Sequence, residues 1–242
     1  MPISTPRPAL SALLLLATSA GAVAAPSPAW DPSVPGTEAC TEAAAAGDLG
    51  AARRHCRVTG GDAHPVDAFN LALLVHAAAP DEARALLTRA GDAGLAEADQ
   101  VLGNLLIDGG DLDAGLERLE RAARAGLALA QYDYATALLE RGAEDEAREA
   151  ARWYGWAAAG GDDAARYNLG VLLLSGRLGE VRPLWAWAWF SSIEAMDGHD
   201  EVRRLARELS SQMDAEERAR AHALLAQVRD DPAAAAAAAA SS

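Results

Sequence analysis

The sequence predicts an all-α protein, an α/α superhelical solenoid in which antiparallel helix hairpins stack side by side. The first observation is a six-residue pattern, small–x–aromatic–x–apolar–small, which is clearest at residues 165–170. Weaker copies lie at 130–135, 98–103 and 67–72, and their closing small residues are 31, 32 and 35 positions apart. A period of this length indicates stacked supersecondary units. The second observation is a further pattern that follows each copy and completes a two-helix unit.

This second pattern has a small residue, bulky residues three and four positions later, small residues seven and eight positions later, and then glycine. In the third unit these residues are Ala150, Trp153, Tyr154, Ala157, Ala158 and Gly161. Residues three and four apart share a helix face, so the bulky and small residues form one packing stripe. The closing small residue of the first pattern, such as Gly170, then lets the second helix approach the first closely.

Helix-breaking proline and glycine residues between the two patterns indicate where one predicted helix ends and the next begins. Pro80-Asp81, Gly110-Asp111 and Gly161-Asp162 each place a breaker before an aspartate that can cap the next helix. Asp214 and Glu217 have the spacing of a capping box.

We expect a signal peptide (1–24), a proline-rich lead-in (25–36), an N-terminal capping hairpin (37–61), four repeats (62–198), a closing helix pair (199–230) and a disordered polyalanine tail (231–242). Alanine favours helix, but a run this short is not stable alone.

The N-terminus predicts export. Arg7 precedes an apolar run from Ala9 to Ala17, and Ala22-Val23-Ala24 fits a signal-peptidase site with cleavage after Ala24. The apolar run is shorter than the roughly 20 residues that span a bilayer, so we expect no transmembrane anchor. A periplasmic or secreted location follows.

The two cysteines, Cys40 and Cys56, each lie eight residues from Asp48 in a predicted helix–turn–helix. In an antiparallel hairpin they lie at matching heights, and an exported protein meets an oxidising environment. We therefore expect a disulfide. The alternative, a reactive thiol activated by His55, is disfavoured because adjacent residues point apart on a helix.

Composition excludes several kinds of function. A formal net charge of −14 disfavours nucleic acid as a partner, because phosphate binding needs clustered cations. The five histidines are scattered without metal-ligand spacing, and no phosphate loop or nucleophile motif is present. The sequence therefore nominates no catalytic residue, no metal site and no cofactor.

The two patterns together resemble the Sel-one-like repeat (SLR) family, whose helical hairpins are related to the tetratricopeptide repeat. The resemblance covers roughly residues 65–200 and is most specific at 165–170, 153–158 and 186–190. Residues 201–217 resemble the helix pair that closes many bacterial members. The chain departs from the family pattern where Gln100 replaces the aromatic and Tyr134 replaces the leucine.

The resemblance implies a curved stack whose first helices line a concave surface that binds a protein or peptide. It places the aromatic position and the residue after the closing small residue on that surface. The expected binding residues are Phe69, Gln100, Asn104, Tyr132, Thr136 and Tyr167. For each tyrosine, packing inside the repeat is the competing interpretation.

Two further alternatives stay open at this level. Trp185, Trp187 and Trp189 either pack in the core and against the closing helices or form an exposed surface for sugars. The main functional hypothesis is a non-catalytic periplasmic scaffold or adaptor. Its alternative is a cell-envelope enzyme or a protein that binds cell-wall ligands.

Overall fold

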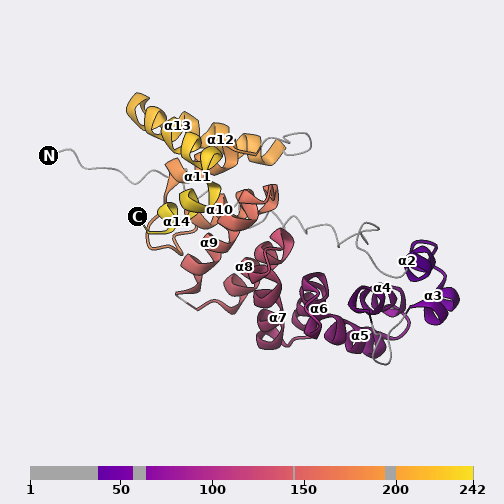
Figure 1. Ribbon diagram of the computed structural model, residues 1–242. Helices are drawn as coiled ribbons and strands as arrows, with labels where there is room; N and C mark the ends of the chain where they lie inside the picture. The colour runs from indigo at the N-terminus through magenta and orange to yellow at the C-terminus, as the bar shows by residue number, and fades with distance from the viewer. Residues whose placement is uncertain (1–37, 57–63, 144, 194–199, 242) are drawn as a thin grey trace. The chain divides into compact units, whose positions relative to one another are not determined.

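The computed structural model describes residues 38–56, 64–143, 145–193 and 200–241. In these residues the regular structure consists of thirteen α-helices and no strands, so the predicted all-α class is confirmed (Figure 1). The signal peptide, its cleavage site and the proline-rich lead-in lie outside the described residues. These described residues divide into two compact units, an N-terminal unit that ends at residue 137 and a C-terminal unit that begins at residue 138.

The N-terminal unit is a row of helix hairpins. Neighbours in sequence are neighbours in space: α2 packs on α3, α4 on α5, α5 on α6, and α6 on α7. Helix α2 also contacts α4, which joins the first hairpin to the repeats. The helices are α2 (Glu38–Ala45), α3 (Leu49–His55), α4 (Pro65–Val75), α5 (Pro80–Asp92), α6 (Ala96–Asp108), α7 (Leu112–Arg124) and α8 (Ala128–Arg141), whose last residues belong to the C-terminal unit.

Local sequence sets where these helices begin. The side chain of Asp111 accepts a hydrogen bond from the Ala114 N–H at the start of α7, as predicted. Gly110, just before it, has a φ of 89°, a conformation that glycine adopts without strain. The prediction for α5 was wrong, because the helix begins at Pro80 and Asp81 lies inside its first turn. Proline is well suited to the first helical position, where its missing N–H has no partner to lose.

Close helix contacts depend on the small residues that the sequence pattern singled out. A Cβ atom on Gly103 of α6 would lie 2.7 Å from Cγ of Leu119 on α7. Real Cβ atoms do not approach other heavy atoms this closely, so only glycine fits unless Leu119 moves. The small closing residue of the first helix therefore does set the approach of the second.

The predicted disulfide is present. Cys40 of α2 and Cys56, which follows α3, are bonded, with their Cα atoms 4.6 Å apart. Both cysteines are buried, and Ala43 and Ala52 pack beside them in the same core cluster. The bridge closes the first hairpin of the N-terminal unit.

The C-terminal unit contains the later helices. α9 packs on α10, α10 on α11, and α11 on both α12 and α13. The capping box that starts α13 is formed as predicted, with Asp214 and Glu217 each bonding the other's backbone N–H. The bounds are α9 (Glu146–Ala159), α10 (Asp163–Leu174), α11 (Pro183–Ser191), α12 (Asp200–Ser211), α13 (Ala215–Asp230) and α14 (Pro232–Ser241).

The polyalanine tail differs from the prediction. We expected residues 231–242 to be disordered, but Pro232–Ser241 forms α14, which packs along α9. Ala235, Ala236, Ala239 and Ala240 are buried in that contact. A short alanine helix is marginal alone, and burial against α9 supplies the stabilisation that the sequence of the tail does not reveal.

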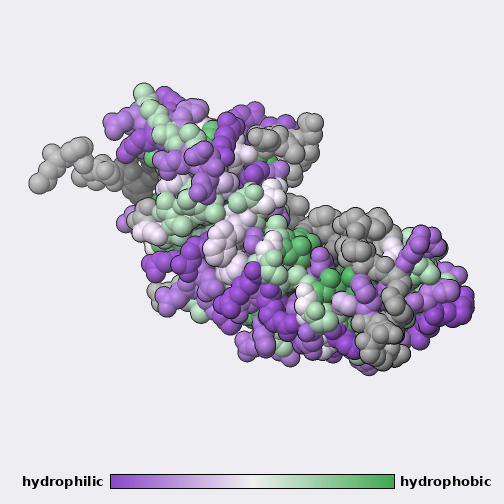
Figure 2. Space-filling model, in the orientation of Figure 1, coloured by the Kyte–Doolittle hydropathy of each residue, from purple (hydrophilic) through white to green (hydrophobic). Residues whose placement is uncertain are grey.

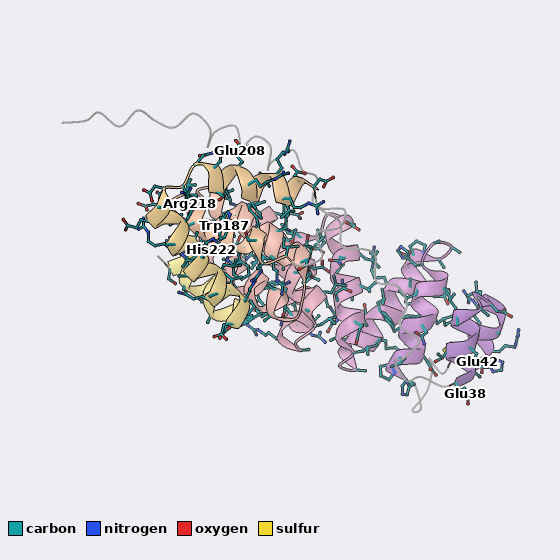
Figure 3. The ribbon with its side chains drawn as sticks, turned by 90° about the horizontal axis from the view of Figure 1, so that it is seen from above. Glu38, Glu42, Trp187, Glu208, Arg218 and His222 are labelled. Carbon is teal, nitrogen blue, oxygen red and sulfur yellow. A yellow bond between two sulfur atoms is a disulfide. The ribbon has the colours of Figure 1, made fainter. Side chains whose placement is uncertain are left out.

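The tryptophans of α11 divide between core and surface. Trp189 is fully buried, as the packing interpretation predicts. Trp187 is partly exposed and meets His222 of α13 edge-on, with ring centroids 4.9 Å apart (Figure 3). Trp187 therefore covers the contact between α11 and a closing helix, which is the role that the packing interpretation gave to one of these residues.

Candidate binding face

The structure buries the residues at the aromatic position of the repeat. Phe69, Gln100, Tyr132 and Tyr167 are each at most 8% exposed. Side chains buried to this degree pack inside the repeat, which is the alternative that the sequence left open for Tyr132 and Tyr167. The two other predicted residues, Asn104 and Thr136, are partly exposed. A binding role for the six predicted residues stays a prediction. Of the six, only Asn104 and Thr136 are partly exposed at the surface.

Tyr167 illustrates the packing role. Its ring lies 5.8 Å from that of Phe190, centroid to centroid, at the crossing of α10 and α11. Burial raises the pKa of its phenol, and the negative charge of Glu201 raises it further. The side chain is thus a neutral part of the C-terminal core.

Three polar side chains join the first helices of two consecutive repeats. Gln100 and Asn104 lie one turn apart on α6, and both side-chain amides donate to Oδ2 of Asp133 on α8. The Gln100 Nε2 to Oδ2 distance is 2.5 Å, and the Asn104 Nδ2 to Oδ2 distance is 2.8 Å. Hydrogen bonds to an ionised acceptor are stronger than those between neutral groups. We call Gln100, Asn104 and Asp133 the amide–carboxylate cluster.

Sequence reasoning found two members of this cluster and missed the third. Asp133 occupies the repeat position just after the aromatic, where Asn70 and Asn168 stand in two other repeats. The sequence did carry a signal for Asp133, because the position after the aromatic is polar in three of the four copies of the pattern. The contact also explains why glutamine stands at the aromatic position of this repeat, because the Gln100 amide reaches the Asp133 carboxylate of the next repeat.

Partly exposed apolar residues follow the two amides of the cluster along α6. Val101 and Leu105 are next in sequence to Gln100 and Asn104 and form the adjoining stripe of α6, and Leu73 has the repeat position of Asn104 on α4. All three are partly exposed while packing on the core. Figure 2 shows green, apolar side chains gathered around α6. We define the first-helix face as the partly exposed residues Leu73, Val101, Asn104, Leu105, Asp133 and Thr136.

A second charged cluster lies at the junction of α5, α6 and α7. Arg118 donates to Asp92 at 2.8 Å and to Asp99 at 3.0 Å, and Arg121 pairs with Asp99 at 3.1 Å. The hydrogen bond from Arg118 lowers the pKa of Asp92, and these carboxylates hold the pKa of Arg118 above its usual value despite its partial burial. Every charge in this cluster has an opposite partner inside the chain, which indicates a structural role.

The described residues contain no group of three or more His, Cys, Asp or Glu side chains placed to hold a metal ion. Nor does any helix among them have the length and apolar character needed to cross a membrane.

Comparisons with known proteins give likenesses among solved structures alone. No protein-family model matches the chain, and no curated protein does. Among solved structures, the chain is similar to the crystal structure of a protective antigen of uropathogenic Escherichia coli strains, described as displaying an SLR fold. The two share 18% sequence identity with a TM-score of 0.45, and the match covers 82% of this chain. The match spans 57% of the antigen's chain.

Proposed function

We propose that this protein is a non-catalytic scaffold or adaptor of the periplasm, which binds a protein or an extended peptide on the first-helix face of its N-terminal unit. The observation that carries the proposal is the amide–carboxylate cluster, which lies beside partly exposed apolar side chains on consecutive first helices. Surfaces that bind extended peptides combine polar groups for the backbone with apolar area for side chains.

The buried residues have a supporting part in this proposal. Phe69 and Tyr132 pack beneath the face, and Gln100 fixes Asp133 in place. A partner would meet Asn104, Asp133 and Thr136, together with the apolar stripe of α6. The hydroxyl of Thr136 already donates to the Tyr132 carbonyl at 3.0 Å, which holds its side chain in one orientation. Such fixed groups lose little conformational freedom on binding.

Export is supported by two features of different kinds. The sequence begins with the pattern of a signal peptide. The buried Cys40–Cys56 disulfide suits an oxidising compartment.

The test is chemical crosslinking in intact cells followed by purification, comparing two matched double variants. Leu73→Arg with Thr136→Arg places bulky charge on the first-helix face. Thr88→Arg with Ala85→Arg makes the same change of net charge on the second helix α5, at a partly exposed and an exposed position. We expect the first pair to lose the crosslinked partners and the second pair to retain them, with both showing wild-type circular dichroism.

Equal recovery of partners by both pairs would reject the first-helix face. A separate assay with cell-wall fragments and generic hydrolase substrates addresses the alternative class. Turnover that survives purification to homogeneity would reject the non-catalytic scaffold itself.

A further inference from the structure

The arginines in the repeats of the N-terminal unit lie on second helices. Across the first helices α4, α6 and α8, up to residue 137, the sequence has five carboxylates and no arginine, and the chain contains no lysine. The second helices α5 and α7 together have six carboxylates and five arginines. The first helices therefore carry charge of one sign, whereas the second helices carry both signs in nearly equal numbers.

Three of the five first-helix carboxylates reach the surface. Asp67 and Asp99 are buried, and Asp99 pairs with arginines of α7. Glu97 and Asp133 are partly exposed, and Asp108 is exposed. Solvent and any partner therefore meet only negative charge on these first helices.

Two of these carboxylates flank the apolar stripe of α6. Glu97, Val101, Asn104 and Asp108 follow one another at intervals of four, three and four residues, a spacing that puts them on one side of the helix. Val101 and Asn104 belong to the first-helix face. The face therefore has a carboxylate near each end of α6, in addition to Asp133 of α8.

Hydrogen bonds inside the chain make this face a set of acceptors. Asn104 turns its amide nitrogen to Oδ2 of Asp133, so its carbonyl oxygen, which can only accept, lies on the other side of the amide. The hydroxyl of Thr136 donates its one hydrogen to the Tyr132 carbonyl, which leaves its oxygen as an acceptor. An ionised carboxylate such as that of Asp133 has no hydrogen to donate. A partner that bonds to these three groups must supply the donors.

Cationic side chains match both properties of the face. Guanidinium and ammonium groups are donors without acceptors, and they carry the charge that attracts carboxylates. Their long aliphatic stems also cover apolar area while the charged group stays at the surface. A segment rich in Asp or Glu would meet like charge, which opposes association.

From these observations we propose that the partner of the first-helix face is a cationic segment, an extended stretch of protein or peptide that combines arginine or lysine with apolar side chains. Its cations bond to Asn104 and Asp133 and are attracted by Glu97 and Asp108, and its apolar side chains cover Val101 and Leu105. The sign of the partner's charge is an addition to the proposed function, on which this inference rests.

The test is fluorescence anisotropy with the purified full-length chain and two labelled peptides. In the first peptide, pairs of leucine alternate with pairs of arginine, so that each side of an extended chain carries both. In the second peptide, glutamine replaces every arginine. We expect the arginine peptide to bind roughly tenfold more tightly than the glutamine peptide, and its binding to weaken as salt screens the charges.

Two matched double variants locate the attraction. Glu97→Gln with Asp108→Asn should weaken binding of the arginine peptide roughly threefold or more and leave binding of the glutamine peptide unchanged. Asp81→Asn with Glu117→Gln removes the same two charges from exposed positions on second helices and should leave binding of both peptides unchanged. Equal weakening by the two doubles would mean that the general acidity of the chain attracts the peptide, and would overturn the proposal.

Two further outcomes separate this inference from the proposed function. If the glutamine peptide binds as tightly as the arginine peptide, and Leu73→Arg with Thr136→Arg abolishes its binding, the face binds peptides without selecting cations. The charge preference then falls and the proposed function stands. An arginine peptide that does not bind also removes the charge preference, while crosslinking in cells still decides whether the face has a partner.

Discussion

Gly170 of α10 lies against the ring of Phe190 on α11, so closely that a Cβ atom on residue 170 would be 2.5 Å from Cε1 of the ring. Phe190 is fully buried, so its ring cannot turn outward into solvent without disturbing the core. The absence of a side chain at residue 170 is therefore what lets these two helices cross at this distance.

Replacing Gly170 with leucine should overpack this crossing and lower the free energy of unfolding by about 1–3 kcal/mol. Chemical denaturation followed by circular dichroism measures the change. Ala164→Leu, at a partly exposed position of the same helix, is the matched control and should stay close to wild type. Equal stability of Gly170→Leu and wild type would show that the helices can separate without penalty.

The amide–carboxylate cluster should stabilise the N-terminal unit. Asp133→Ala leaves the amides of Gln100 and Asn104 without their shared acceptor, which costs about 1–3 kcal/mol where the groups stay buried. Asp133→Asn keeps an acceptor oxygen and should recover part of the loss. Thermal unfolding of the three proteins tests this order; an Asn variant as unstable as the Ala variant would contradict it.

The disulfide should contribute about 3 kcal/mol, as expected for a closed loop of roughly this length. Reductant should therefore lower the midpoint of thermal unfolding. The double variant Cys40→Ala with Cys56→Ala has no other cysteine, so its midpoint should be insensitive to reductant. A wild-type midpoint that does not move on reduction would show that the first hairpin is held by packing alone.

Acid should weaken the C-terminal unit through Glu146. Hydrogen bonds from Arg141 and from the Ala143 N–H lower the pKa of this carboxyl below its ordinary value of 4.5. The unfolded chain then binds more protons between the two pKa values, so the stabilisation is complete above about pH 4.5 and is lost as pH falls through the folded-state pKa. Glu146→Gln should make the free energy of unfolding less dependent on pH in this range. If the variant loses stability on acidification as steeply as the wild type, Glu146 is not responsible for the pH dependence.

Arg118 should matter far more than its neighbour Arg124. Arg118 is 19% exposed and faces the buried Asp99, whereas Arg124 is 70% exposed and pairs with Glu120 on the surface. Arg118→Met removes one of two cations from a buried carboxylate and should destabilise by about 3 kcal/mol. Arg124→Met should change stability by less than about 1 kcal/mol. Denaturant unfolding distinguishes the two, and equal effects would mean that Arg121 alone satisfies Asp99.

The sequence predicted the helices well because their signals are local. A period of about 32 residues, paired small and bulky positions, and caps such as Asp111 and Asp214 depend on neighbours a few positions away. The disulfide was also predictable, since Cys40 and Cys56 flank one turn symmetrically. The capping role expected of Asp81 failed because Pro80 itself suits the first helical position.

The candidate site was predicted less well, since exposure depends on how whole helices pack. The family resemblance supplied Gln100 and Asn104 as expected binding residues, and that role stays a prediction. The resemblance could not show that Phe69, Gln100 and Tyr132 are buried. Asp133 was missed because its partners are 29 and 33 residues away.

The sequence alone determined an all-α chain of repeated hairpins, because helix periodicity, glycine placement and capping are properties of short segments. The tertiary structure alone decided two other matters. It showed which members of the repeat reach the surface, and it showed that the alanine run is an ordered helix on α9. The physical reason is the same for both: burial is a property of pairs of helices, and the glycine that receives Ala236 lies 81 positions earlier in the chain.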